Sequence, residues 1–96
     1  MPDMLHELEQ IILERKQNPV ASSYTNRLFT DGAPRIAQKV GEEATEVIVA
    51  ALAQGRDQQV GELADLFYHT LVLMAQLDIT LADVEGVLER RHKGDR

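Results

Sequence analysis

Apolar positions recur along the chain with helical spacing in four segments. In residues 4–16 leucines and isoleucines lie three or four residues apart, as in an amphipathic helix, and Asn18-Pro19 ends this segment. The second segment runs from Pro34, which suits a first helical turn, to about Gln54, before Gly55. Its inward stripe is predicted to contain Ile36, Val40, Ala44, Val47, Ile48 and Ala51.

Two further helices are predicted over residues 57–77 and 80–91. Asp57 is the candidate N-cap of the first, and Thr80 with Asp83 resembles a capping box for the second. The inward residues of this last helix would be Leu81, Val84, Val87 and Leu88. Residues 20–33 are polar and turn-rich, and we interpret them as a structured loop with room for one helical turn. The chain is therefore expected to be a single all-α domain, residues 1–96, with four helices and no repeat.

The third predicted helix is apolar on all sides between Leu66 and Ala75. Three short amphipathic partners can hardly surround such a helix in a chain of 96 residues. In the second helix Val49 and Ala50 lie off the inward stripe, which leaves its C-terminal half without a polar face. We therefore expect an intertwined homodimer whose central bundle contains the second and third helices of both chains.

Composition and charge limit the metal ligands and the binding partners that the chain can have. The chain lacks cysteine and tryptophan, so any metal must be held by oxygen or imidazole. A formal net charge of −6 argues against general nucleic-acid binding, although one anionic nucleotide remains possible if a cation offsets the field. The N-terminal residues do not resemble a signal peptide, and no apolar run approaches the roughly 18 residues of a membrane helix. A soluble, cytoplasmic protein is expected.

Two pairs of carboxylates are the strongest candidates for chemistry. Glu43 and Glu46 lie in the second predicted helix, and Glu62 and Asp65 lie near the start of the third. Residues three apart share a helix face with Cβ atoms roughly 5–6 Å apart, and like charges at that spacing repel unless they face water or a cation. Converging on adjacent antiparallel helices, the four would form an oxygen site suited to Mg²⁺ or Mn²⁺, whereas Zn²⁺ would draw more imidazole.

A solvated acidic face is the simpler alternative, and the helix dipole could account for Glu62 and Asp65. Two observations favour a metal site. Glu43 falls at the border of the apolar stripe, and the helix around Glu62 and Asp65 is apolar, so a carboxylate there needs a partner. A Mg²⁺ site of this kind suits phosphate-ester or anhydride chemistry, with the number of ions left open.

Other polar residues are open to two interpretations. His69, one turn beyond Asp65, could contact a carboxylate or substrate, or be a core histidine bonded to a neighbour. Lys39, one turn before Glu43, could meet a substrate phosphate or form a surface ion pair. For Arg27 and Arg35, which flank the loop before the acidic helix, nothing local distinguishes phosphate binding from solubility. The basic residues 90–93 suit a helix C-terminus.

Three motifs together resemble the phosphoribosyl-ATP pyrophosphatase family, within the wider all-α nucleoside-triphosphate pyrophosphatase superfamily and its MazG-like bundle. The resemblance extends over about residues 23–87, most of the chain. It is carried by Ser23-Tyr24-Thr25-Asn26-Arg27-Leu28 followed by Gly32; Ile36-Ala37-Gln38-Lys39-Val40-Gly41-Glu42-Glu43-Ala44-Thr45-Glu46; and Glu62-Leu63-Ala64-Asp65-Leu66-Phe67-Tyr68-His69. The resemblance implies a helical dimer that uses Mg²⁺ to hydrolyse phosphoribosyl-ATP to phosphoribosyl-AMP and diphosphate, the second step of histidine biosynthesis.

The same resemblance implies residue roles. By position, Glu43, Glu46, Glu62 and Asp65 correspond to metal ligands, and Glu42 to a further ligand or the group that orients water. The substrate contacts it implies are Tyr24, Thr25, Arg27 and Lys39, and His69 is a further candidate. Some relatives are fused to the cyclohydrolase of the next step, for which this chain is expected to be too short.

The mechanism we expect is in-line attack of metal-activated water at the α–β diphosphate linkage. Two alternatives remain at this point. One is a related pyrophosphatase that removes noncanonical nucleoside triphosphates, and the other is a non-enzymatic helical dimerisation module with an acidic face.

Overall fold

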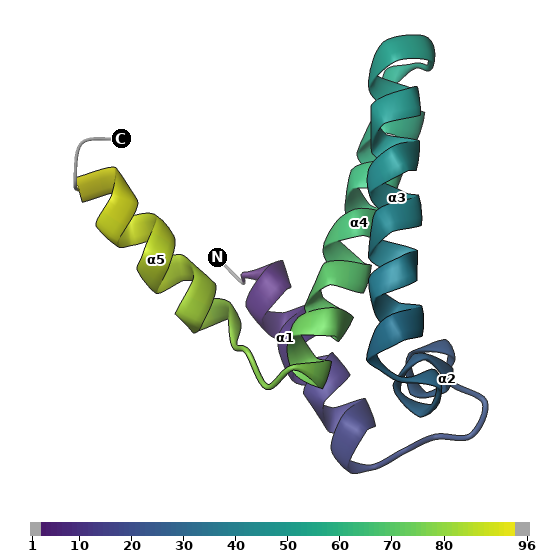
Figure 1. Cartoon of the computed structure of the whole chain (residues 1–96), viewed down its shortest axis with the longest axis vertical. Helices are drawn as coiled ribbons and strands as arrows, with labels where there is room; N and C mark the ends of the chain where they lie inside the picture. The colour runs from purple at the N-terminus through teal and green to yellow at the C-terminus, as the bar shows by residue number, and fades with distance from the viewer. Residues whose placement is uncertain (1–2, 94–96) are drawn as a thin grey trace.

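The computed structural model describes residues 3–93, which form helices and connecting turns with no strand in that range. The helices are α1 (Met4–Gln17), α2 (Tyr24–Asp31), α3 (Ala33–Ala53), α4 (Arg56–Gln76) and α5 (Leu81–Lys93) (Figure 1). The all-α prediction is confirmed. The predicted number of helices is wrong by one, because the segment interpreted as a loop contains α2.

Helix α2 begins and ends at recognisable capping residues. The Ser23 hydroxyl accepts a hydrogen bond from the Asn26 amide at 3.3 Å, as an N-cap side chain does. Gly32, with φ of +89°, follows the last helical residue in a backbone conformation that side-chain-bearing residues rarely adopt. Eight residues are too few to show helical periodicity clearly, so this helix depends on packing, with Leu28 buried in the core.

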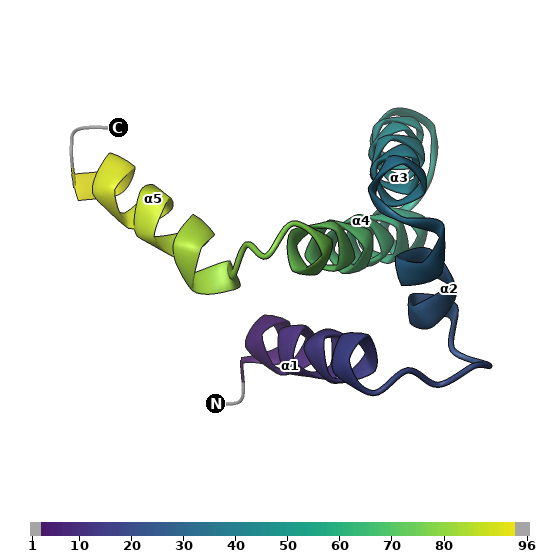
Figure 2. The same cartoon turned by 60° about the horizontal axis from the view of Figure 1, so that its bottom comes forward.

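Helices α3 and α4 form a long antiparallel hairpin, and α1 and α2 pack at the end away from its connecting turn (Figures 1 and 2). Pro34 lies in the first turn of α3, as predicted. The predicted N-cap of α4 is wrong: Gly55 precedes the helix, and Asp57 lies within its first turn. A carboxylate there still interacts favourably with the helix dipole.

The hydrophobic core lies where the first four helices meet. Its buried residues come from α1, α2, α3 and α4: Ile12, Leu28, Ile36, Leu71, Val72 and Ala75. On α3 the buried line is Ile36, Glu43 and Ala50, at seven-residue spacing. The predicted stripe was therefore wrong in its C-terminal half, because Ala50 is buried whereas Ile48 is 58% exposed and Ala51 is exposed.

The half of the hairpin nearest its turn exposes apolar side chains on both helices. Those on α3 and α4 are Ile48, Val49, Leu52, Val60, Leu63 and Phe67. We call these six residues the hairpin patch. One chain thus leaves uncovered the apolar surface that the sequence indicated on these two helices. None of the described helices combines the length and apolarity of a membrane span.

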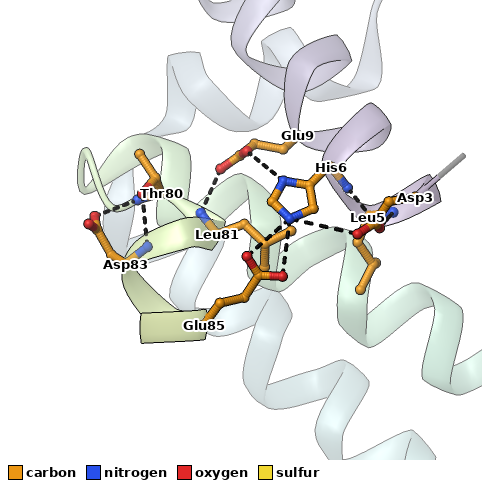
Figure 3. Close-up of polar contacts among 8 residues, drawn as sticks. All are labelled: Asp3, Leu5, His6, Glu9, Thr80, Leu81, Asp83 and Glu85. Carbon is orange, nitrogen blue, oxygen red and sulfur yellow. Dashed lines mark hydrogen bonds and ion pairs between the residues drawn. The ribbon is translucent and has the colours of Figure 1, made fainter. Parts of the chain in front are cut away.

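Helix α5 projects away from the other helices (Figures 1 and 2), and none of its residues is buried. The predicted capping box is confirmed: the Thr80 amide donates to Asp83 at 2.9 Å, and the Asp83 amide donates to Thr80 Oγ1 at 3.0 Å. The predicted inward orientation is wrong for Val84 and Leu88, which are exposed in a single chain, whereas Leu81 packs against the core and Val87 is half-buried. Two polar contacts attach α5 to α1 (Figure 3). The Leu81 amide donates to Glu9, and His6 bonds to Glu85.

Candidate active site

Three carboxylates from α3 and α4 meet on the face between these helices. Glu43, Glu46 and Glu62 each offer an oxygen, and these oxygens lie within 4.8 Å of one another. Glu43 and Glu46 are one turn apart on α3, and the antiparallel hairpin brings Glu62 of α4 alongside them. The sequence-based expectation that carboxylates from two helices converge is thus realised by three of the four residues.

Two of these carboxylates have an oxygen with no hydrogen-bond donor. Oε2 of Glu43 and Oε2 of Glu62 are buried and lack a partner among residues 3–93. Burial raises the pKa of Glu43 and of Glu62 above the usual value, and the hydrogen bond and negative charge of Glu46 raise both further. Unpaired carboxylate oxygens are unfavourable in such a place unless a cation meets them, so this donor set fits a hard divalent ion.

Asp65 and Glu42 lie outside this group of three. Asp65 is exposed on α4, one turn beyond Glu62, and its negative charge contributes to the raised pKa of Glu62. Glu42 is exposed on α3, where its carboxylate accepts from Gln38 at 3.1 Å and pairs with Lys39 at 3.3 Å. Their roles as a metal ligand and as a water-orienting group stay predictions.

Lys39 places a positive charge directly beside the acidic group. Its Nζ lies 3.3 Å from Glu42 and 3.6 Å from Glu43. Burial alone would lower the pKa of Lys39, but the hydrogen bond to Glu42 and the nearby negative charges raise it. The ammonium group is therefore charged at neutral pH. Lys39 thus forms ion pairs with two glutamates, and its contact with a substrate phosphate stays a prediction.

Side-chain bonds join α2 to the acidic turn of α4. His69 Nδ1 lies 2.7 Å from the backbone oxygen of Asp65, and its Nε2 lies 2.9 Å from the Tyr24 hydroxyl. Because a carbonyl only accepts, Nδ1 carries a proton and donates to the Asp65 oxygen; in the tautomer with that single ring proton, Nε2 accepts from the Tyr24 hydroxyl. Thr25 bonds to Tyr68 next to this pair.

His69 is thus a buried histidine with both ring nitrogens bonded, the second of the two interpretations of this residue. Sequence reasoning assigned no role to Tyr68, whose hydroxyl fixes Thr25. One signal in the sequence could have indicated a role for Tyr68: it is a polar aromatic residue directly before His69, within a stretch of mainly apolar residues. Arg27 is exposed and stacks on Tyr24, with its guanidinium 5.5 Å from the ring centre.

Comparison of the amino-acid sequence with known protein families gives one match. The sequence profile of the phosphoribosyl-ATP pyrophosphohydrolase family matches residues 5–92. The chain belongs to this family. The resemblance carried by the three motifs is confirmed, and the matched range includes all the carboxylates described above.

Individual relatives are similar over most of the chain. The phosphoribosyl-ATP pyrophosphatase of Pyrobaculum arsenaticum is 50% identical over 90 residues, which are 94% of this chain and 96% of the relative. That of Bacillus mycoides is 46% identical over 101 aligned positions, covering 100% of this chain and 94% of the relative. The histidine biosynthesis bifunctional protein HisIE of Caldanaerobacter subterraneus is 48% identical over 91 residues, but the match spans 44% of its length.

Proposed function

We propose that this chain hydrolyses phosphoribosyl-ATP to phosphoribosyl-AMP and diphosphate, the second step of histidine biosynthesis. The observation that carries the proposal is the group formed by Glu43, Glu46 and Glu62, with two buried oxygens that lack a donor, in a chain of the phosphoribosyl-ATP pyrophosphohydrolase family. Similarity to relatives named phosphoribosyl-ATP pyrophosphatase, at about half identity over nearly their whole length, supports the choice of substrate.

Mg²⁺ is the cofactor in this proposal, with Mn²⁺ as a substitute. Glu43, Glu46 and Glu62 would hold it, and Asp65 is available from the next turn of α4. An all-oxygen donor set with no imidazole suits these hard cations. When bound, such an ion activates water as a nucleophile and neutralises charge on phosphate oxygens.

The protein's own side chains orient the reactants. In the hydrolysis the water oxygen bonds to the α-phosphorus, and the oxygen that bridges the α- and β-phosphorus atoms leaves with diphosphate. Lys39, charged and beside the acidic group, is placed to neutralise a phosphate oxygen, and Glu42 next to it to orient water. Tyr24 and Thr25 are bonded to His69 and Tyr68 of α4, and the family pattern suggests that both contact the substrate.

A homodimer in the cytoplasm is part of the proposal. The hairpin patch and the apolar residues of α5 supply surface that one chain leaves uncovered. Bifunctional relatives named for histidine biosynthesis support a functional link to the cyclohydrolase that would consume phosphoribosyl-AMP.

Diphosphate release tests the proposed reaction. We expect Mg²⁺-dependent release from phosphoribosyl-ATP with a kcat/KM well above the values for ATP, dATP and dUTP, and loss of release when the metal is chelated. Clear preference for the simple triphosphates would instead assign the chain to removal of noncanonical nucleotides. Absence of hydrolysis with every substrate would favour a non-enzymatic helical module.

A further inference from the structure

A hollow that none of the three carboxylates lines lies where the loop before α2 meets α2 and the start of α3. Its volume is about 350 Å³, and Tyr24, Arg27 and Arg35 are among the residues that line it. Tyr24 links this hollow to α4, because it lines the hollow and its hydroxyl bonds to His69, whose ring bonds to the backbone oxygen of Asp65. We call this hollow the arginine cavity.

The guanidinium groups are the donors of this cavity that remain available to a ligand. Asn26 is occupied, since its side chain accepts from the Val20 amide at 2.7 Å and donates to the Arg15 carbonyl at 2.6 Å. Thr30 donates to the backbone oxygen of Asn26 at 2.9 Å. Neither Arg27 nor Arg35 forms an ion pair within residues 3–93.

The charge of the cavity is positive although the chain as a whole is acidic. Asp31 is the carboxylate in the lining, against two guanidinium groups. One of these groups is restrained, because the Arg27 guanidinium lies over the Tyr24 ring, 5.5 Å from its centre, and the hydroxyl of that ring is bonded to His69. A guanidinium presents paired N–H groups to a phosphate, and one that is already restrained loses less entropy on binding.

Helix α3 links the arginine cavity to the acidic group. At 100° per residue, Arg35, Lys39 and Glu46 fall within about 40° of one another, so they share one face of α3. Arg35 precedes Glu46 by eleven residues, which is roughly 16 Å along the helix axis. The arginine cavity and the acidic group therefore lie along the same face of α3. An extended nucleotide with phosphate at both ends can span the distance between them.

We infer that the arginine cavity binds the terminal phosphate of the phosphorylated ribose, while the triphosphate lies at the carboxylates. This inference rests on the proposed function, since phosphoribosyl-ATP carries that phosphate monoester and ATP does not. Arg35 and Arg27 are then specificity-determining residues that act far from the bond that breaks. They distinguish the substrate from ATP.

Steady-state kinetics of Arg35→Gln test the inference. Losing a charge-assisted bond to a phosphate should raise KM for phosphoribosyl-ATP by about 10-fold or more, with the loss falling mainly on KM. The preference for phosphoribosyl-ATP over ATP, as a ratio of kcat/KM values, should fall by a similar factor. Arg91→Gln, an exposed arginine of α5, removes the same charge away from the cavity and is the matched control.

Ribose 5-phosphate gives a readout that does not depend on turnover. We expect it to bind the wild-type chain in a calorimetric titration without metal, to bind Arg91→Gln equally, and to bind Arg35→Gln at least about 10-fold more weakly. Equal binding by both variants, or a KM for Arg35→Gln within about twofold of the control, would overturn the inference. Wild-type turnover tests the proposed function separately, because an active enzyme with an unaffected Arg35→Gln variant refutes only the cavity assignment.

Discussion

Glu43 shows most clearly how a single residue departs from the rules of a helix core. It occupies the middle of the buried line Ile36, Glu43, Ala50, where an apolar side chain would be expected. Because burial raises its pKa, its ionised form destabilises the metal-free fold. The penalty is absent below the ordinary pKa, grows as the pH rises from the ordinary to the raised pKa, and is complete above the raised one. A bound cation would remove that penalty.

Glu43→Gln keeps the shape of the side chain and removes its charge. We expect Mg²⁺-dependent diphosphate release to fall by about 100-fold or more. Substituting a residue that only supports a metal ligand already lowers metal affinity or activity by about 10–100-fold. The melting temperature without metal should stay equal or rise at pH 8, because the buried charge is gone. Enzyme assays and thermal unfolding with and without Mg²⁺ measure both effects.

Glu89→Gln, which changes an exposed glutamate of α5, is the control for that substitution. It should alter neither the activity nor the response to Mg²⁺. Full activity in Glu43→Gln would mean that the three carboxylates are only an acidic surface, as the simpler interpretation of the sequence holds.

At this scale the sequence predicted carboxylates by type and spacing, but not the bonds that surround them. Helical spacing alone placed Glu43 with Glu46, and the hairpin added Glu62. The bond between Tyr24 and His69 joins residues 45 positions apart, and no periodicity in the chain encodes it. Such contacts depend on how α2 docks, which local sequence does not determine.

The predictability of each helix followed its length. Helices α3 and α4 are 21 residues each and were predicted to within a few residues, because a long periodic pattern averages out local exceptions. Helix α2 has eight residues. Its capping residue Ser23 lies in a run of polar residues, several of which could have been the N-cap. The first turn of α4 lacks a side-chain cap, so the sequence pattern wrongly predicted the nearby Asp57 as the N-cap.

The attachment of α5 to α1 should depend on pH. His6 Nε2 lies 3.1 Å from the Glu85 carboxylate, and Asp3 and Glu9 of the α1 side also face the ring (Figure 3). The hydrogen bond to Glu85 raises the pKa of His6, with the charges of all three carboxylates adding to it. A raised histidine pKa stabilises the contact below the ordinary value of 6.5, and this stabilisation is lost as the pH rises through the raised value.

Hydrogen exchange at α5 amides measures this attachment. After correction for intrinsic exchange, protection of α5 relative to α3 should be greater at pH 5.5 than at pH 8.5. Glu85→Gln removes the main partner of His6 and should flatten that difference, whereas Glu89→Gln on the same helix should preserve it. An equal pH response in the two variants would mean that His6 does not hold α5.

For the whole molecule, the all-α class followed from the pattern, but the distribution of buried surface did not. The third predicted helix looked apolar on every side, and the structure divides it into a buried half with Leu71 and Val72 and an exposed half with Leu63 and Phe67. A periodic pattern gives the amount of apolar surface that needs covering. It does not say whether the same chain or another one covers it.

The proposed dimer predicts which substitutions separate the chains. Leu52 is 83% exposed and Leu63 is 42% exposed, both in the hairpin patch. Leu52→Lys with Leu63→Lys should convert a particle of twice the chain mass to one of single mass in sedimentation equilibrium, because charges would be buried in an apolar interface. Ile11→Lys, at 45% exposed on α1, is the matched control and should stay dimeric. A wild-type chain that sediments as a monomer would contradict the dimer, and the uncovered apolar surface would then require a different partner.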